Sequence, residues 1–73
     1  MVGRGYETPI ERVTAELRAR VLADEWDHGD ALPSVSELAR TYSVSRATAG
    51  RAVANLVDEG LLFTRERWAT FRA

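Results

Sequence analysis

The sequence predicts a mainly α-helical domain in which three helices are followed by a small β-hairpin. Three segments carry apolar residues at the spacing of a helix, and a serine or threonine that can cap a helix precedes each segment. A glycine ends the third segment, and two short runs of strand-forming residues follow it on either side of a charged turn. At 73 residues, the chain has room for one domain.

The first helix is predicted to have Thr8 as its N-terminal cap and to end near residue 23. A proline follows Thr8, and proline suits the first helical position because its φ is fixed and its missing N–H is not needed there. Apolar residues then recur on one face: Ile10, Val13, Leu17 and Val21. Residues 1–8 contain two glycines and no periodicity, so we interpret them as a flexible lead-in to a domain over residues 9–73.

A polar turn over residues 24–30 is predicted to follow, and we interpret Ala31-Leu32 as a very short strand. Ser34 then marks the start of the second helix, because Glu37 three residues later completes a capping-box pattern. Apolar side chains form the buried side of this helix: Val35, Leu38 and Ala39.

The third helix is predicted to follow a turn over residues 41–44, with Ser45 as its cap. Its apolar face comprises Ala49, Ala52, Val53 and Leu56. Gly60 is expected to end this helix, because glycine adopts the left-handed conformation found after many helices.

Strand-forming runs over residues 61–64 and 68–71 complete the pattern, joined by the charged turn Arg65-Glu66-Arg67. We interpret them as a two-stranded hairpin that projects as a wing. The predicted fold class is therefore a three-helix winged helix-turn-helix, mainly α with a small β-wing.

The composition argues against several classes of function. The chain has no cysteine and a single histidine, His28, so it offers no thiolate metal site, metal cluster or hydrolytic triad. We therefore expect no enzyme activity, no cofactor and no metal site. No apolar run approaches the roughly 20 residues that span a bilayer, and the N-terminus lacks the pattern of a signal peptide. We expect a soluble, cytoplasmic protein without a membrane partner.

The formal net charge is −1, but the charge is unevenly distributed. Residues 1–30 carry four arginines and seven acidic residues, whereas residues 31–73 carry six arginines and four acidic residues. All ten basic residues are arginine, which suits forked contacts to guanine or phosphate. The basic half thus coincides with the predicted second and third helices and the wing.

The exposed side of the third helix is the main candidate for a contact to DNA. Small side chains beside arginines allow the helix backbone to approach base edges in the major groove. The candidate contact residues of this helix are Ser45, Arg46, Ala47, Thr48, Gly50 and Arg51. For Arg46 the alternative is an ion pair with Glu37 or Asp58. Gly50 in mid-helix suggests a close approach, either to DNA or to a neighbouring helix.

Two further places are candidates for contacts to phosphate. Ser34 and Ser36 lie at the start of the second helix, which crosses the DNA backbone in this motif. Capping alone accounts for Ser34. Arg65 and Arg67 lie at the predicted wing tip, where they could enter a minor groove or pair with phosphates. The alternative is a solvated turn that keeps the hairpin soluble.

The pattern resembles the N-terminal DNA-binding domain of the GntR family of bacterial transcription regulators, from about Tyr6 to the end of the chain. The residues that carry the resemblance are Trp26, Gly29, Leu32-Pro33-Ser34, Glu37-Leu38-Ala39, Tyr42, Val44-Ser45-Arg46, Thr48, Ala52, Leu56, Glu59-Gly60-Leu61 and Thr70-Phe71. It implies a winged helix that binds operator half-sites as a dimer, with Arg46 and Thr48 at contact positions.

Three places depart from the family pattern. Val35-Ser36 stand where Glu-Arg is common, so a frequent arginine contact of the second helix is absent. Gly50 stands where the family usually has an arginine, with Arg51 beside it. Arg67-Trp68-Ala69 replace a glycine-rich wing tip.

The predicted function is sequence-specific binding of double-stranded DNA by a bacterial transcription regulator. We expect this regulator to be a repressor. The third helix would enter the major groove, and the wing would contact the adjacent groove or the backbone. The expected operator is palindromic and the full-length protein a homodimer, with a small-molecule effector only if a C-terminal domain exists. The net acidity supports an alternative, a winged-helix module that binds another protein and no DNA.

Overall fold

The computed structural model describes residues 8–66 and 69–73. Three helices precede two strands, in the order α1 (Pro9–Leu22), α2 (Val35–Tyr42), α3 (Arg46–Asp58), β1 (Leu62–Arg65) and β2 (Ala69–Arg72). This is the winged helix-turn-helix that the sequence predicts. Most of the predicted lead-in, residues 1–7, lies outside the described part of the chain, and Thr8 belongs to the cap of α1.

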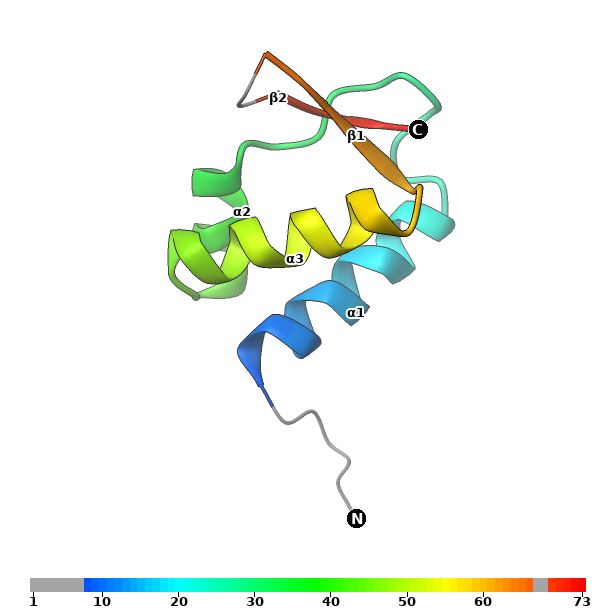
Figure 1. Cartoon of the computed structure of the whole chain (residues 1–73). Coiled ribbons are helices and arrows are strands. Elements are labelled where there is room, and N and C mark those ends of the chain that lie inside the picture. The colour runs from blue at the N-terminus through cyan, green and yellow to red at the C-terminus, as the bar shows by residue number, and fades with distance from the viewer. Residues whose placement is uncertain (1–7, 67–68) are drawn as a thin grey trace.

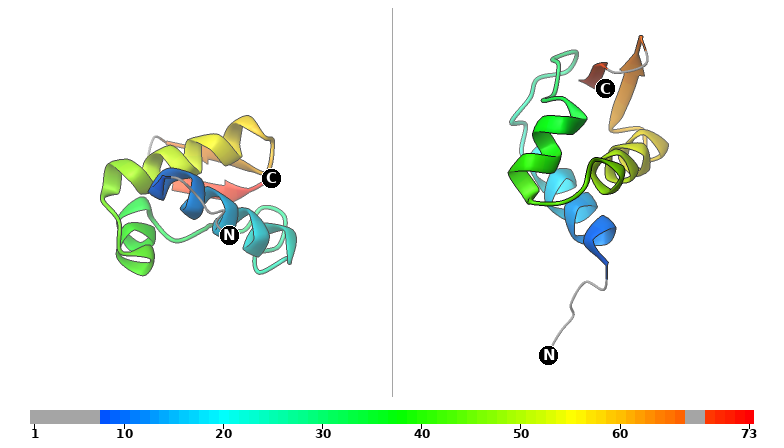
Figure 2. Two further views of the ribbon diagram at one scale, coloured as in Figure 1. Left: turned by 90° about the horizontal axis from the view of Figure 1, so that it is seen from below. Right: turned by 90° about the vertical axis from the view of Figure 1, so that its left-hand side faces the viewer.

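Helix α3 lies at the centre of the domain, between α1 and the hairpin (Figure 1). It contacts α1, α2 and β1. The views in Figure 2 show α1 crossing beneath α3 and the hairpin on the other side of α3. One core joins these elements through buried apolar side chains: Leu17, Val21, Leu32, Leu38, Ala39, Ala49, Val53, Leu56 and Leu62.

All three predicted helix caps are confirmed. The Thr8 hydroxyl accepts from the backbone N–H of Glu11 at 3.0 Å, with Pro9 at the first helical position. Ser34 forms the predicted capping box: its hydroxyl accepts from Glu37 N–H, and the Glu37 carboxylate accepts from Ser34 N–H. Each cap satisfies an N–H group that a helix start leaves without an intrahelical partner.

The turn between α2 and α3 is shorter than predicted. Helix α2 continues to Tyr42, so the connection is Ser43-Val44 rather than residues 41–44. The longer helix has a packing reason, because the Tyr42 ring packs against the core and its hydroxyl accepts from Arg20 Nη1 at 3.0 Å. Ser43 then reverses the chain with a left-handed φ of 58°.

Gly60 ends α3 as predicted, with a φ of +83°. Its N–H bonds to the carbonyl of Val57, and the Leu61 N–H bonds to the carbonyl of Leu56 at 3.0 Å. These two bonds form a Schellman motif, which a residue with a Cβ adopts only with strain. The chain then turns directly into β1.

The hairpin is antiparallel, with Phe63 opposite Phe71 and Thr64 opposite Thr70. Each strand starts and ends one residue later than predicted. The predicted short strand at Ala31-Leu32 is a single bridge: Ala31 pairs with Phe71, and Leu32 N–H donates to the carbonyl of Thr70 at 2.8 Å. The α1–α2 connector therefore runs along the outer edge of β2.

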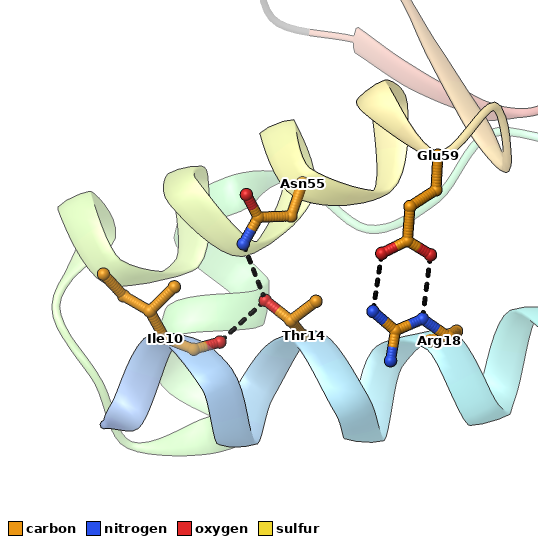
Figure 3. A network of polar contacts seen from close by, with 5 residues as sticks. All are labelled: Ile10, Thr14, Arg18, Asn55 and Glu59. Atoms are coloured by element: carbon orange, nitrogen blue, oxygen red, sulfur yellow. Dashed lines mark hydrogen bonds and ion pairs between the residues drawn. The ribbon is translucent and has the colours of Figure 1, made fainter. Parts of the chain in front are cut away.

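Polar side chains fasten α1 to α3 (Figure 3). Asn55 Nδ2 donates to Thr14 Oγ1 at 3.2 Å, and the buried Thr14 hydroxyl donates to the Ile10 carbonyl at 2.7 Å. One turn further, Arg18 donates through two nitrogens to both carboxylate oxygens of Glu59. Glu59 thereby has a pKa below its ordinary value, chiefly because of the hydrogen bond from Arg18.

The arginine in β2 is structural. Arg72 lies buried at the end of the hairpin, and its Nη1 donates to Asp24 Oδ1 at 3.0 Å and to the Trp26 carbonyl at 2.8 Å. Its charge therefore belongs to the interior and does not add to the exposed basic surface. None of the helices in residues 8–66 and 69–73 is long and apolar enough to cross a membrane.

Candidate nucleic-acid interface

The start of α3 is an exposed helix N-terminus. The Ser45 hydroxyl accepts from Thr48 N–H at 3.0 Å and donates to Thr48 Oγ1 at 3.0 Å. Ser45 thus uses its own hydrogen within the cap, which leaves the Thr48 hydroxyl as the free donor of the pair. Because the first N–H groups of a helix attract anions, this end of α3 suits a phosphate or a base acceptor.

Arg46 joins the starts of α2 and α3. Its Nη1 lies 3.5 Å from Ser36 Oγ, a long hydrogen bond that directs the guanidinium along the α2 side of α3. Within the described residues Arg46 has no ion pair, so the alternative partners Glu37 and Asp58 are not used. The guanidinium of Arg46 is exposed and keeps donors available for another partner.

Small side chains surround Arg46 and Arg51 on α3. Ala47 and Ala54 are exposed and Gly50 is half-buried. A Cβ placed on Gly50 would meet only Val35 Cγ1, at 3.9 Å, which is ordinary van der Waals contact. The neighbouring helix therefore does not require glycine at this position.

The predicted serines of α2 differ in availability. Ser34 is committed to the capping box, so its side chain already has a partner. Ser36 is half-buried and faces Arg46. Capping thus accounts for Ser34, whereas Ser36 belongs to the same surface as the start of α3.

Arg40 is a candidate that the sequence reasoning missed. It lies one helical turn after Ser36 and is exposed, and in the described part of the chain neither the Arg40 side chain nor the Arg51 side chain forms a hydrogen bond or an ion pair. The signal was its four-residue spacing from Ser36, which places both residues on one face of α2. Arg40 and Arg51 extend the exposed basic surface beyond Arg46.

The wing contributes Arg65 to the interface. Arg65 ends β1 and is exposed, and its guanidinium lies over the rings of Phe63 and Phe71. Arg67, the second predicted wing residue, lies outside the described residues. In Figures 1 and 2 the end of β1 lies at the same end of the domain as the start of α3. The start of α3 and the end of β1 therefore lie at one end of the domain.

A groove separates the wing from α3. It is lined by Val35, Gly50, Val53, Ala54, Val57, Asp58, Thr64 and Thr70. The wing thus stands apart from the exposed face of α3. In a winged helix this separation lets a helix and a hairpin reach two neighbouring features of one duplex.

Comparison with known proteins identifies the family. A family model described as bacterial regulatory proteins of the gntR family matches residues 9–71. The chain belongs to this family. The resemblance that the sequence motifs indicate is thereby confirmed, and with it the class of the protein as a winged-helix part of a transcription regulator.

Two curated gntR-type relatives are similar in sequence. The Histidine utilization repressor of Klebsiella aerogenes is 35% identical over 63 residues, which are 86% of this chain and 26% of the relative. The HTH-type transcriptional regulator GmuR of Bacillus subtilis (strain 168) is 36% identical over 61 residues, 84% of this chain and 26% of the relative. The gntR-family chain thus spans about a quarter of the length of these relatives.

A solved structure shows the same fold. The DNA-binding domain of AraR, crystallised in complex with operator ORE1, has a TM-score of 0.88 at 25% identity, over 100% of this chain and 89% of that chain. The GntR-family transcription factor YtrA from Sulfolobus acidocaldarius has a TM-score of 0.80 at 26% identity, over 96% of this chain and 74% of that one. The three helices and the hairpin therefore follow the architecture of DNA-binding members of the family.

Proposed function

We propose that this gntR-family domain binds double-stranded operator DNA sequence-specifically, with the N-terminal half of α3 in the major groove and the wing against the adjacent groove or backbone. One observation carries the proposal. The exposed arginines of α2 and α3 have no acidic partner in the described residues, and the start of α3 lies at the end of the domain to which β1 also points.

The surface chemistry of α3 suits base readout. Arg46 and Arg51 carry planar forks of donors that match guanine O6 and N7 or a phosphate. Ala47, Gly50 and Ala54 are short enough for the α3 backbone to approach the base edges. Thr48 adds a hydroxyl donor for phosphate or base. Together these residues form one recognition surface on the exposed side of α3.

We extend the proposal to the assembly of the full-length protein. A single winged helix reads one half-site, and a second copy in a homodimer would read the other half of a palindromic operator. Bivalent binding explains why an isolated domain is expected to bind weakly. We place the full-length regulator in the bacterial cytoplasm as a repressor, with a small-molecule effector only if a C-terminal domain exists.

The experiment is a titration against a duplex selected by this domain from a random library. Arg46→Ala should weaken binding by about 5- to 150-fold, the equivalent of about 1–3 kcal/mol. The matched control is Arg12→Ala, which removes the same charge from an exposed arginine of α1 that pairs with Glu16. Arg12→Ala should change affinity less than about twofold. If both variants lost the same amount of affinity, α3 would not be part of the DNA interface.

A further inference from the structure

The outer face of the wing carries an aromatic pair. Phe63 and Phe71 face each other across the hairpin, with ring centroids 5.4 Å apart and planes inclined by 18°. Both are half-buried, whereas their neighbours Leu62 and Thr70 point inward and are buried. The two stacked rings, called the aromatic platform below, lie on the side of the hairpin that faces away from α3.

Arg65 lies on this platform. Its guanidinium carbon is 5.8 Å from the centroid of Phe63 and 5.7 Å from that of Phe71. The near-equal distances place the cation over both rings at once. Such contacts are attractive because the ring faces are negative, and two rings hold the side chain more firmly than one.

Stacking leaves the hydrogen-bonding capacity of Arg65 intact. The contact with the rings uses the charge of the guanidinium, and its N–H donors stay available for another partner. In the part of the chain that the structure describes, the Arg65 side chain has neither a hydrogen bond nor an ion pair. Arg65 is therefore held in place while its donors remain open.

A held arginine is better suited to binding than a free one. An unrestrained arginine loses much rotamer freedom when it binds, and a side chain already restrained by packing loses less. The platform also lies on β1 and β2, which the hairpin register and the bridge to Ala31 hold in position. A fixed, forked cation at the end of a strand matches a phosphate group of DNA.

We propose that Phe63 and Phe71 act as positioning residues that present Arg65 to a phosphate of the DNA backbone beside the wing. The inference rests on the proposed function, since it assumes that the domain binds DNA. The inference adds to the proposed function by assigning one contact with the DNA backbone to Arg65 and by giving the aromatic pair a role in binding.

The test is a double-mutant cycle with Arg65→Ala and Phe71→Leu, titrated on the selected duplex at several salt concentrations. Loss of one phosphate contact should weaken binding about fivefold at about 0.15 M salt and reduce the salt slope by about 0.9. Phe71→Leu should weaken binding about two- to threefold in the wild-type background and have almost no effect once Arg65 is alanine. Phe63→Leu is the second variant if Phe71→Leu impairs folding, since both rings contact Arg65.

Three results would overturn the inference. Equal losses from Phe71→Leu with and without Arg65 would show that the rings only support the fold. Loss of affinity on some sequences alone, with an unchanged salt slope, would assign Arg65 to base edges rather than to phosphate. If the Arg65→Ala variant bound DNA with wild-type affinity, Arg65 would make no contact to the phosphate. If Arg46→Ala still weakens binding in these cases, the proposed function stands and only the wing inference fails.

Discussion

Arg72 reaches from the last strand into the interior of the domain and donates to Asp24, 48 residues earlier in the chain, at 3.0 Å. The two ends of this bond differ in environment, since the Arg72 side chain is 9% exposed and that of Asp24 is 71% exposed. A second bond from the same nitrogen reaches the Trp26 carbonyl. Arg72 therefore ties the end of the wing to the connector that leads into α2.

Arg72→Ala is expected to reduce the free energy of unfolding by about 1–3 kcal/mol, because it removes a buried stem and leaves the Trp26 carbonyl without this donor. The control is Asp24→Asn, which removes the charge of an exposed residue and keeps a side chain that tolerates the left-handed φ of 62° at this position. Its effect should stay below about 1 kcal/mol. Urea denaturation measures both, and equal effects would assign the stability to the ion pair itself.

Gly50→Ala should stabilise the folded domain by about 0.5–1 kcal/mol, because alanine favours the helix and the new Cβ meets only Val35, at 3.9 Å. The same substitution at Gly60 should destabilise the domain by a similar amount, about 1 kcal/mol, since Gly60 has a φ of +83°. Thermal unfolding compares the two glycine variants.

Gly50→Ala also tests the approach of DNA to the α3 backbone. If DNA approaches closely, this variant should bind the operator more weakly although its fold is more stable. Tighter binding would contradict a close approach.

The pair between Arg18 and Glu59 predicts a dependence of stability on pH. The pKa of Glu59 is lower in the folded state than its ordinary value, chiefly through the hydrogen bond from Arg18, so the folded state favours the ionised carboxylate. Its contribution is fully present above the ordinary glutamate pKa and is lost as the pH falls through the lowered one. Glu59→Gln should therefore destabilise the domain at about pH 7 and have a smaller effect at about pH 3. A difference independent of pH would show that the pair does not titrate with folding.

Arg40→Ala tests the arginine that the sequence reasoning missed. If Arg40 contacts phosphate, the substitution should reduce the salt slope of DNA binding by about 0.9 and weaken binding on every duplex sequence alike. Arg12→Ala on α1 is again the control, and its slope should equal that of the wild type. An unchanged slope for Arg40→Ala would confine the interface to α3 and the wing.

Local signals in the sequence were enough to predict most of the fold. The capping hydroxyls of Thr8, Ser34 and Ser45 each accept a hydrogen bond from the backbone N–H three residues later. A capping pattern can therefore be recognised without knowledge of the tertiary structure. Gly60 is similar, because the Schellman motif is closed by neighbouring residues. The boundary of α2 was less predictable, because Tyr42 extends this helix through contacts with Arg20 and the core.

The candidate site depended more on tertiary structure. The charge distribution along the sequence groups Arg72 with the other arginines of the basic half. In the structure its hydrogen bond to Asp24, 48 residues earlier, holds it in the interior. No local sequence pattern distinguishes Arg72 from the exposed Arg65. The hydrogen bond from Arg46 to Ser36 also joins two helices, so sequence reasoning named both residues without predicting their contact. The aromatic platform depends on the hairpin register, which places Phe63 opposite Phe71.

The most direct test of the proposed interface is amide chemical-shift mapping of the isotope-labelled domain with the duplex that it selects. We expect the amides of residues 45–51 and those at the end of β1 to shift together as DNA is added, while those of Arg12 and Glu16 on α1 stay unchanged. Shifts confined to α1, or an α3 that responds only to a partner protein and remains silent with DNA, would contradict it.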